Sequence, residues 1–461
     1  MTRRRSLIVA ANRLPMTRDT GDGDRWQISP GGLVAALAPA LDEREATWVG
    51  WTGGPDDCPG PLTVDGIGLV AVGLNDHEIA AYYQGFANST LWPLYHDAIV
   101  VPQFHRSWWS AYQKVNERFA HAIAATAARG ATVWIHDYHL QSVPAMLRAV
   151  RPDLRIGFFL HIPFPPQELF MRIPWRTELI RGLLGADVIG FQTAVGASNF
   201  RQIARRLLAA QPRGTEIHSE GRTIICETFP AGIDAARVQM LAATPSCRAE
   251  AAALREEFGT NRQILLGVDR LDYTKGITVR LRAYGEMLAD GMIDPSKVVM
   301  VQIAQPTRND TPGYDEVRAE VEQLVGQING DFATMSSLAV KYLHQGQTFE
   351  QLVALYRSAD IMLVTPFRDG MNLVAKEFVA ANHDRPAGLV LSEFAGASHQ
   401  LRTTHLINPY DIADVKRSIQ AALNAPPSER LRTMRRLASN VRRQDARWWS
   451  SSFLARLEGD T

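Results

Sequence analysis

The hydrophobic residues of the chain fall into short apolar runs that alternate with longer amphipathic stretches. Runs of this kind are typical of buried parallel strands, and the amphipathic stretches are typical of the helices that connect them. In the first half the pattern predicts strands at residues 7–10, 133–135, 156–160 and 188–191. In the second half it predicts strands at residues 264–268, 298–303, 361–364 and 389–391. The sequence therefore predicts an α/β protein.

The amphipathic stretches indicate the helices and the division into domains. Helical spacing is found at residues 107–128 and 315–327, and at 248–258 just before the first strand of the second half. A connector at residues 229–234 separates the two sets of strands, so we place the domain boundary near residue 235. The sequence predicts one domain at residues 1–235, a second at 236–445, and a helix at 446–461 that packs back on the first.

The composition agrees with two ordinary globular domains. A length of 461 residues exceeds what one hydrophobic core usually organises. Hydrophobic residues make up 46% of the chain and charged residues 21%. Because no apolar run approaches the roughly 18 residues of a membrane helix, we expect a soluble protein. The basic N-terminus is followed by an apolar stretch of only strand length, so we expect no secretory signal.

Cysteine usage and charge restrict the class of protein further. The three cysteines lie far apart and without the spacing of metal ligands, which argues against a disulfide framework or a structural zinc site. Because the cysteines show no disulfide spacing, we expect a protein of the reducing cytoplasm. A formal net charge of +1 removes the general electrostatic argument for a nucleic-acid partner, so any anion must be bound locally.

Polar and glycine residues follow the predicted strands of the first half. Ligands of open parallel sheets bind beyond the carboxyl ends of the strands, so these segments are candidate sites. Asn12 and Arg13 follow the first strand, and Gly31 and Gly32 precede a helical stretch where backbone amides could approach a phosphate. A flexible turn that begins a helix is the alternative interpretation of the glycine pair.

Aromatic residues and histidines follow further along the first half. The segment 82–93 combines tyrosines and a tryptophan with amide side chains, which suits either a sugar pocket or the packing of a loop against the core. His136 and Asp137 follow one predicted strand and His161 follows the next, so polar groups gather at one edge of the sheet. Structural histidines remain an alternative. A metal site is conceivable, but no His-x-x-x-His pair sets its geometry.

In the second half, charged residues follow three predicted strands. Arg270 and Lys275 lie on either side of a turn just before a helix, as in a cationic clamp for a diphosphate, although an exposed turn with paired charges is the alternative. Arg308 follows the next strand. Asp369 precedes a helix whose first amides face the same edge, or it caps that helix. Glu377 lies near the second turn of this helix, within reach of a ribose.

Together these motifs resemble the trehalose-6-phosphate synthase family. Each motif is weak alone, but seven occur in the family's order from residue 7 to about residue 410. They are Asn12-Arg13, Gly31-Gly32, Tyr82-Tyr83 with Leu91-Trp92-Pro93, 136–140, 158–165, 269–276 and 368–377. The resemblance implies a GT-B fold, in which two Rossmann-like domains with parallel sheets face a central cleft. It also implies transfer of glucose, with retention, from a nucleoside diphosphate glucose to glucose 6-phosphate.

The resemblance further implies a role for each residue. The acceptor would be bound by Arg13, Tyr83, Trp92, Asp137, Gln192 and Arg308. The donor would be bound by Gly32, His161, Arg270, Lys275, Asp369, Gly370, Met371, Asn372, Leu373, Val374 and Glu377, with Glu377 at the ribose. The base pocket would hold His344, Gln345 and Gln347, and the catalytic residues would be Arg270, Lys275, His161 and Asp369.

The residue types agree with this chemistry. A diphosphate leaves readily once cations and helix amides stabilise its charge, so we expect neither a protein nucleophile nor a metal or other cofactor. Uridine-using relatives often carry an aromatic residue near position 347, where this chain has His344-Gln345-Gly346-Gln347. This departure favours GDP-glucose as donor over UDP- or ADP-glucose. A second departure, Gln400 where the family usually has Glu, lies outside the expected substrate residues.

Two other functions stay open. A related synthase could use glycerol 3-phosphate or a cyclitol as acceptor, but such relatives alter the Gly31-Gly32 loop or the acceptor aromatics. A catalytically silent sugar-phosphate sensor would not need the full set of charged residues. The expected partners are the two substrates and a separate trehalose-6-phosphate phosphatase, without nucleic acid or membrane. A homo-oligomer is compatible with the sequence.

Overall fold

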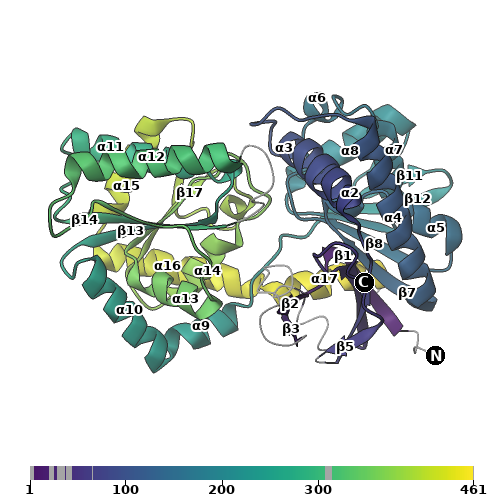
Figure 1. Cartoon of the computed structure of the whole chain (residues 1–461), viewed down its shortest axis with the longest axis horizontal. Helices are drawn as coiled ribbons and strands as arrows, with labels where there is room; N and C mark the ends of the chain where they lie inside the picture. Colours follow the sequence, from purple (N-terminus) through teal and green to yellow (C-terminus); the bar gives the residue numbers. More distant parts are fainter. Residues whose placement is uncertain are drawn as a thin grey trace. The chain divides into compact units, whose positions relative to one another are not determined.

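Two compact α/β units make up the structure, a computed structural model (Figure 1). It describes residues 5–19, 25–28, 37, 44–64, 66–306 and 314–459. One unit consists of Met1–Ala231 together with Ala446–Thr461, and the other consists of Gly232–Asp445. The boundary expected near residue 235 lies close to this division. None of the helices within the described ranges is long and apolar enough to cross a membrane.

A large sheet with the order β10-β11-β12-β9-β8-β7-β1-β4-β6-β5 organises the first unit. Neighbouring strands from β12 to β6 are parallel, and antiparallel pairs lie at both edges. The strands are β1 (Arg5–Arg13), β4 (Ala46–Trp51), β5 (Leu62–Val64), β6 (Ile67–Ala71), β7 (Ala127–His136), β8 (Arg155–Leu160), β9 (Val188–Phe191), β10 (Gln211–Arg213), β11 (Glu216–Ser219) and β12 (Arg222–Thr228). A separate hairpin pairs β2 (Met16–Asp19) with β3 (Arg25–Ile28).

The order of the parallel strands reverses between β1 and β7. The strands β4 and β6 lie on one side of β1, whereas β7, β8 and β9 follow one another on the other side. This is the doubly wound order of Rossmann-type domains, in which the reversal leaves a crevice beyond the carboxyl ends of the two central strands.

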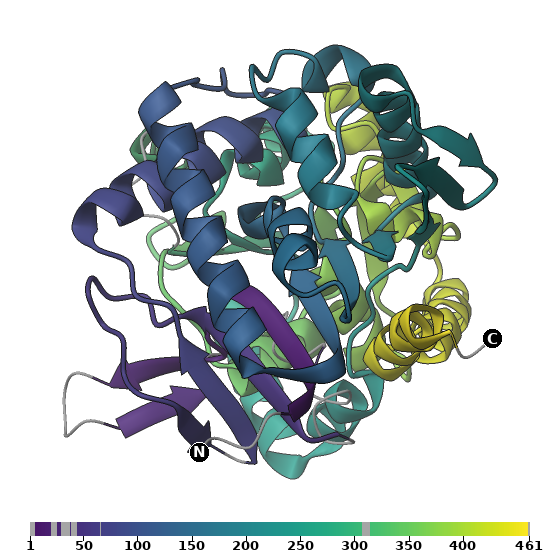
Figure 2. The same ribbon diagram turned by 90° about the vertical axis from the view of Figure 1, so that its right-hand side faces the viewer.

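Helices cover the sheet of the first unit through apolar faces. In α4, for example, Tyr112, Val115, Phe119 and Ile123 are buried at helical spacing, and this helix packs over β1 and β4 (Figure 2). The helical segments are α2 (Asp76–Glu78), the π-helix η1 (Ile79–Leu91), α3 (Trp92–Tyr95), α4 (Arg106–Thr126), η2 (Tyr138–Leu140), α5 (Val143–Val150), α6 (Gln167–Phe170), α7 (Arg176–Leu183), α8 (Ala194–Leu208) and α17 (Ala446–Glu458).

Helix α17 belongs to the first unit although the whole second unit precedes it in the chain. It packs on β8 and β9, where the ring of Phe453 stacks on Trp134 with centroids 4.6 Å apart. A Cβ atom at Gly157 or Gly190 would approach Phe453 to 2.7 or 2.8 Å, so these glycines make room for the helix.

The second unit has a six-stranded parallel sheet with the order β15-β14-β13-β16-β17-β18. Here the order reverses between β13 and β16, again as in Rossmann-type domains. The strands are β13 (Gln263–Arg270), β14 (Val298–Gln305), β15 (Val340–Leu343), β16 (Ile361–Val364), β17 (Gly388–Ser392) and β18 (His405–Ile407). The structure thus confirms the expectation of two Rossmann-like domains.

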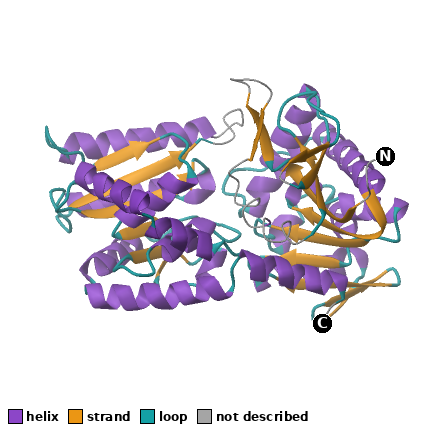
Figure 3. Ribbon diagram, turned by 90° about the horizontal axis from the view of Figure 1, so that it is seen from below, coloured by secondary structure: helices purple, strands orange, loops and turns teal. Residues whose placement is uncertain are grey.

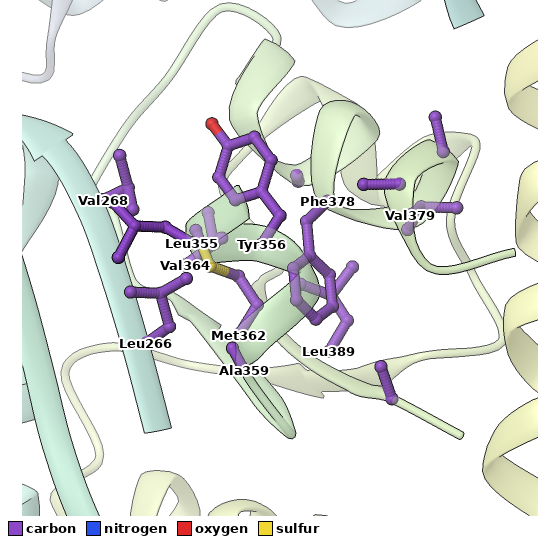
Figure 4. Packing of buried hydrophobic residues seen from close by; sticks show 14 of the residues in the cluster. Leu266, Val268, Leu355, Tyr356, Ala359, Met362, Val364, Phe378, Val379 and Leu389 are labelled. Carbon is purple, nitrogen blue, oxygen red and sulfur yellow. The ribbon is translucent and has the colours of Figure 1, made fainter. Parts of the chain in front are cut away.

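Both faces of this sheet are buried between helices (Figure 3). Because strand side chains alternate, Ile264 and Leu266 join one apolar cluster while Leu265 joins the other. Part of the first cluster is shown in Figure 4. The helical segments are α9 (Ala235–Ala243), α10 (Pro245–Phe258), η3 (Tyr273–Lys275), α11 (Ile277–Ala289), α12 (Tyr314–Phe332), α13 (Phe349–Ser358), α14 (Leu373–Ala381), η4 (Gly396–His399), α15 (Ile412–Asn424) and α16 (Pro427–Arg443).

All eight predicted strands are confirmed, whereas the interpretation of the aromatic segment needs correction. The aromatic segment 82–93 is helical rather than a loop, since it lies in η1 and α3. The edge strands β10 and β11 were not among the predicted strands. The helix expected at residues 446–461 corresponds to α17, and the break before it at Gln444 and Asp445 coincides with the return of the chain to the first unit.

Candidate active site

The strand reversal of the first unit places Arg13 and Asp137 at the same edge of the sheet. Arg13 is the last residue of β1, and Asp137 directly follows β7, the strand that pairs with β1. Side chains that follow these two strands lie at the crevice where Rossmann-type sheets bind ligands. Asp137 has a φ of 74°, a left-handed conformation that is uncommon for residues other than glycine.

An aromatic surface holds the side chain of Arg13. Its guanidinium carbon lies 4.4 Å from the centroid of the Trp51 ring, and Tyr83 packs edge-on against the same ring at 5.5 Å. Gly53 leaves space for the guanidinium group, because a Cβ atom there would lie 1.6 Å from Arg13 Nη1. Arg13 remains exposed. The structure therefore brings Arg13 and Tyr83 together and presents a cation beside a phenol, an arrangement that can bind an anion.

Two other expected acceptor residues are largely buried. Trp92 has only 4% of its surface exposed, and its ring packs against His96 and Tyr138. Gln192 follows β9 and is 6% exposed, and its Oε1 accepts a hydrogen bond of 2.9 Å from the backbone amide of Ala231. Each of these side chains can offer a ligand only a small part of its surface.

His161 and Asp137 are adjacent at the carboxyl ends of β8 and β7. Asp137 Oδ1 accepts a hydrogen bond of 3.1 Å from the backbone amide of His161. The His161 ring shares a 3.0 Å hydrogen bond between its Nε2 and Nδ1 of His136, and Trp449 of α17 packs edge-on against it. Burial lowers the pKa of His161 to about 3, so this side chain is neutral near neutral pH.

In the second unit, the strand reversal brings together the turns after β13 and β16. Asp272 stabilises the first turn by accepting hydrogen bonds from the amide and hydroxyl of Thr274, at 3.0 and 2.9 Å. Gly276 has a φ of 58°, and a Cβ atom there would lie 2.1 Å from the carbonyl oxygen of Thr365, which follows β16. Only glycine allows this close approach of the two turns.

Lys275 and Asp369 form an ion pair at this reversal. Lys275 Nζ lies 2.6 Å from Asp369 Oδ2, and Asn372 Nδ2 donates to the same oxygen at 3.2 Å. Asn372 also caps α14, since its Oδ1 accepts a hydrogen bond from the amide of Ala375. Arg270 ends β13 with an exposed side chain. These groups place two cations and the amino end of a helix at one edge of the sheet, which suits a diphosphate.

A second, fully buried ion pair supports the turn that carries Lys275. Arg280 Nη2 lies 2.6 Å from Asp269 Oδ2, and Arg280 is 0% exposed. The same guanidinium group donates to the carbonyl oxygens of Lys275 at 3.0 Å and of Leu363 at 2.8 Å. Arg280 thus ties the turn after β13 to β16.

The remaining donor residues follow β16 and lie in α14. Met371 is buried, Leu373 and Val374 pack against the apolar cluster of this unit, and the backbone of Gly370 lies against Gly396. Glu377 is half-buried, and its Oε2 accepts a hydrogen bond of 2.9 Å from the hydroxyl of Tyr356. Burial raises the pKa of Glu377, and the hydrogen bond from Tyr356 opposes this effect.

The expected base-pocket residues follow β15, two strands away from β13. His344 is half-buried, Gln345 is exposed and Gln347 is half-buried. Arg308 and Gly32, like Gly31, lie outside the described residues. Within the part of the chain that the structure describes, no group of three or more His, Cys, Asp or Glu side chains could hold a metal ion.

The structure also places residues at these two edges that the sequence interpretation did not name. Trp51 and Gly53 support Arg13, Arg280 supports Lys275, and Tyr356 contacts Glu377. Trp51 is the last residue of the short apolar strand β4, and Gly53 follows it closely, so this segment carried a signal of the same kind as the predicted sites.

The model of glycosyltransferase family 20 matches residues 5–459. The chain belongs to this family. This family 20 glycosyltransferase is 51% identical over 465 residues to the trehalose-6-phosphate synthase of Mycolicibacterium gilvum (strain PYR-GCK), covering 97% of the chain and 92% of that relative.

Solved structures resemble this family 20 glycosyltransferase over nearly its whole length. An α,α-trehalose-phosphate synthase (UDP-forming) from Burkholderia xenovorans in complex with glucose-6-phosphate matches with a TM-score of 0.90 and 33% identity, covering 98% of this chain and 99% of that one. A trehalose-6-phosphate structure from E. coli bound with UDP-2-fluoro glucose matches with a TM-score of 0.90 and 32% identity, covering 98% of each chain. The expected GT-B class, with two parallel-sheet domains, is confirmed.

Proposed function

We propose that this glycosyltransferase is a trehalose-6-phosphate synthase. It transfers glucose, with retention, from a nucleoside diphosphate glucose to glucose 6-phosphate and forms α,α-trehalose 6-phosphate. The observation that carries the proposal is the 51% identity to the Mycolicibacterium gilvum synthase over 97% of the chain. The glucose-6-phosphate and UDP-2-fluoro glucose in the two solved relatives support the substrate classes.

In this proposal the first unit binds the acceptor. The guanidinium group of Arg13 and the hydroxyl of Tyr83 hold the phosphate, together with Arg308. Arginine suits this role because its planar group donates two parallel hydrogen bonds to a phosphate. Asp137 accepts from a sugar hydroxyl, and the small accessible parts of Trp92 and Gln192 line the sugar.

The second unit binds most of the donor. Arg270 and Lys275 hold the diphosphate. The backbone amides at the amino end of α14 carry partial positive charge and also attract it. Asp369 holds the glucose, together with His161, Gly32 and the segment from Gly370 to Val374. Glu377 accepts from the ribose, while His344, Gln345 and Gln347 contact the base.

The reaction breaks the bond between the anomeric carbon of glucose and the phosphate oxygen, and the electron pair goes to the diphosphate. The acceptor hydroxyl attacks the same face of that carbon, and its proton goes to the departing phosphate oxygen. Arg270 and Lys275 stabilise the charge that grows on the leaving group, which is where fixed cations lower a barrier most. Neutral His161 can orient a hydroxyl by hydrogen bonding and carries no charge of its own.

We expect nucleotide release from the donor to require glucose 6-phosphate. Release should be much slower with unphosphorylated glucose, because the site for the phosphate then stays empty. For the same reason, Arg13→Ala or Arg308→Ala should raise the KM for glucose 6-phosphate by about tenfold or more, with the donor KM changed much less. Steady-state assays check this, and Arg181→Ala, at an exposed arginine of the same unit, serves as the control.

The same assay separates the alternatives. Release with glycerol 3-phosphate or a cyclitol, but not with glucose 6-phosphate, would identify a related synthase. Binding of glucose 6-phosphate without any release would identify a sensor. Equal use of glucose and glucose 6-phosphate would remove the need for a phosphate site.

We predict that GDP-glucose is a better donor than UDP-glucose or ADP-glucose. The loop His344-Gln345-Gly346-Gln347 offers amide groups that can pair with guanine, and a Cβ atom at Gly346 would meet nothing within 4 Å. A buried polar group left unpaired by the wrong base would lower efficiency by about tenfold to a hundredfold. Comparison of kcat/KM for the three donors decides the matter. Preference for UDP-glucose would refute this choice, would match the description of the Burkholderia xenovorans relative as UDP-forming, and would leave the synthase proposal intact.

We also propose that the reaction needs no divalent metal, because Arg270 and Lys275 can neutralise the diphosphate. Enzyme treated with a chelator should therefore keep its full rate with donor and glucose 6-phosphate. Adding magnesium or manganese should change that rate by less than about twofold, which is small on the scale expected for loss of a charge-stabilising group. Activity that disappears with chelator and returns only with metal would contradict the proposal.

A further inference from the structure

The hydroxyl of Tyr356 and the carboxylate of Glu377 meet between helices α13 and α14. The Tyr356 ring is fully buried, and its hydroxyl donates to Glu377 Oε2 at 2.9 Å. Figure 4 shows the ring among the apolar side chains of the second unit, with its oxygen pointing away from them. This tyrosine therefore directs its one polar atom out of the core and toward Glu377.

Several contacts fix the direction of that hydroxyl. The side-chain amide of Asn382 donates to the carbonyl oxygens of Tyr356 and Phe378, both at 3.0 Å, and so ties the end of α13 to α14. A capping box formed by Thr348 and Gln351 fixes the beginning of α13. Tyr356 thus reaches Glu377 from a helix held at both ends.

The contact uses one oxygen of the carboxylate and leaves the other available. Among the residues that the structure describes, no second hydrogen bond to the Glu377 side chain is found. Burial raises the pKa of Tyr356 well above its usual value, so the hydroxyl keeps the proton that it donates to Glu377. A carboxylate accepts hydrogen bonds at both oxygens, so the Oε1 atom is the one that can accept from a ligand.

We propose that Tyr356 is a positioning residue for the donor nucleotide: its hydroxyl holds Glu377 Oε2 so that Oε1 accepts a hydrogen bond from a ribose hydroxyl. The inference rests on the proposed function, in which Glu377 contacts the ribose. Without the hydroxyl, the carboxylate can rotate, and the ribose hydrogen bond loses its fixed acceptor. The effect should therefore fall on the recognition of the ribose hydroxyl and not on the base or the diphosphate.

The test is binding of GDP and UDP, each with its 2′-deoxy and 3′-deoxy forms, measured by calorimetry. For wild-type protein we expect at least one deoxy form to bind about tenfold more weakly than the ribonucleotide, since hydrogen bonds to charged groups are among the stronger ones. In Tyr356→Phe this preference should fall to about twofold or less. Tyr356→Met also removes the hydroxyl but packs differently in the core. It should show the same loss of preference for the ribonucleotide over the deoxy forms.

Tyr284→Phe is the matched control. Tyr284 is also fully buried in the second unit, but its hydroxyl donates to the backbone carbonyls of Val298 and Ala339. This variant should keep the wild-type preference even if its stability falls. A further check is Glu377→Gln combined with Tyr356→Phe: the double variant should lose no more ribose preference than either single variant.

The outcomes separate this inference from the proposed function. If Tyr356→Phe weakens ribonucleotide and deoxynucleotide binding equally, the preference is unchanged and the inference is wrong. A wild-type protein that binds both nucleotides without any ribose preference, yet transfers glucose, also overturns the inference while the synthase proposal stands. Failure of wild-type protein to bind any nucleoside diphosphate would instead overturn the proposed function.

Discussion

Replacing Lys275 by alanine is expected to lower turnover by about 100- to 1000-fold, the usual loss when one fixed donor to a developing negative charge is removed. Lys275 Nζ is held by Asp369 at 2.6 Å, and its backbone carbonyl is held by Arg280, so the ammonium group is in place before substrate binds. Arg270→Ala should cause a loss of similar size. Single-turnover assays with saturating donor and glucose 6-phosphate measure the effect on the chemical step.

The control for Lys275→Ala is Lys416→Ala. Lys416 also forms ion pairs, with Glu286 and Asp290, both at 2.9 Å, but on the helix α15 away from the strand reversal. Its replacement should leave turnover within about twofold of wild type, because exposed ion pairs contribute little. If Lys275→Ala folds normally and turns over as fast as Lys416→Ala, the assignment of Lys275 to the leaving group is wrong.

Replacing Arg280 by methionine is expected to lower the free energy of unfolding by about 3–5 kcal/mol. The change leaves the buried carboxylate of Asp269 without its arginine partner. The same change removes the hydrogen bonds that tie Lys275 to β16, so turnover should fall as well. Hydrogen exchange of the β13 and β16 amides, measured at increasing urea, reports the unfolding free energy of this region.

Arg282→Met is the matched control on the same helix. Arg282 pairs with Glu320, but more than half of its side chain is exposed, and exposed pairs contribute at most about 1 kcal/mol. If Arg280→Met and Arg282→Met lower the free energy of unfolding by similar amounts, the buried ion pair contributes no more to stability than an exposed one. Loss of turnover in Arg280→Met without loss of exchange protection would show that Arg280 acts only on the site.

The sequence predicted the central strands well because parallel strands between two layers of helices are apolar on both faces. The runs at β9 and β16, for instance, were predicted with the bounds that the structure has. The edge strands β10 and β11 were not predicted, since one of them begins with Gln211 and Pro212 and both are partly exposed. Their pairing depends on neighbouring strands and not on an apolar pattern.

The helical form of the aromatic segment could not be predicted from local preference. Residues Ile79–Leu91 include glycine, asparagine, serine, threonine and two tyrosines, all of which have low or moderate helix propensity. Tertiary packing determines the structure here: Tyr82 is fully buried and donates to Asn12, which lies 70 residues earlier in the chain. Local sequence carries no information about such a partner.

In the candidate site, too, some residues could be predicted from local sequence and others only from the fold. Residues at or shortly after the carboxyl ends of strands, such as Arg13, Asp137 and Lys275, could be predicted because parallel strands present these ends at one edge. The side chains that orient these residues could not be predicted. Trp51 reaches Arg13 from the neighbouring strand, and Arg280 reaches Lys275 from inside a helix. These contacts join residues through the fold, so only the structure identifies them.

The packing of α17 has a consequence for the synthesis of the protein. The ribosome produces residues 1–231 first, but Trp134 and Phe159 obtain their partners Trp449 and Phe453 only after the whole second unit has been made. Until α17 has been synthesised, the first unit therefore exposes the apolar surface that this helix covers in the folded protein. Exposed apolar surface of this kind aggregates readily and is recognised by chaperones. The second unit, which is continuous in the chain, can complete its fold during translation, so the unit that emerges first is completed last.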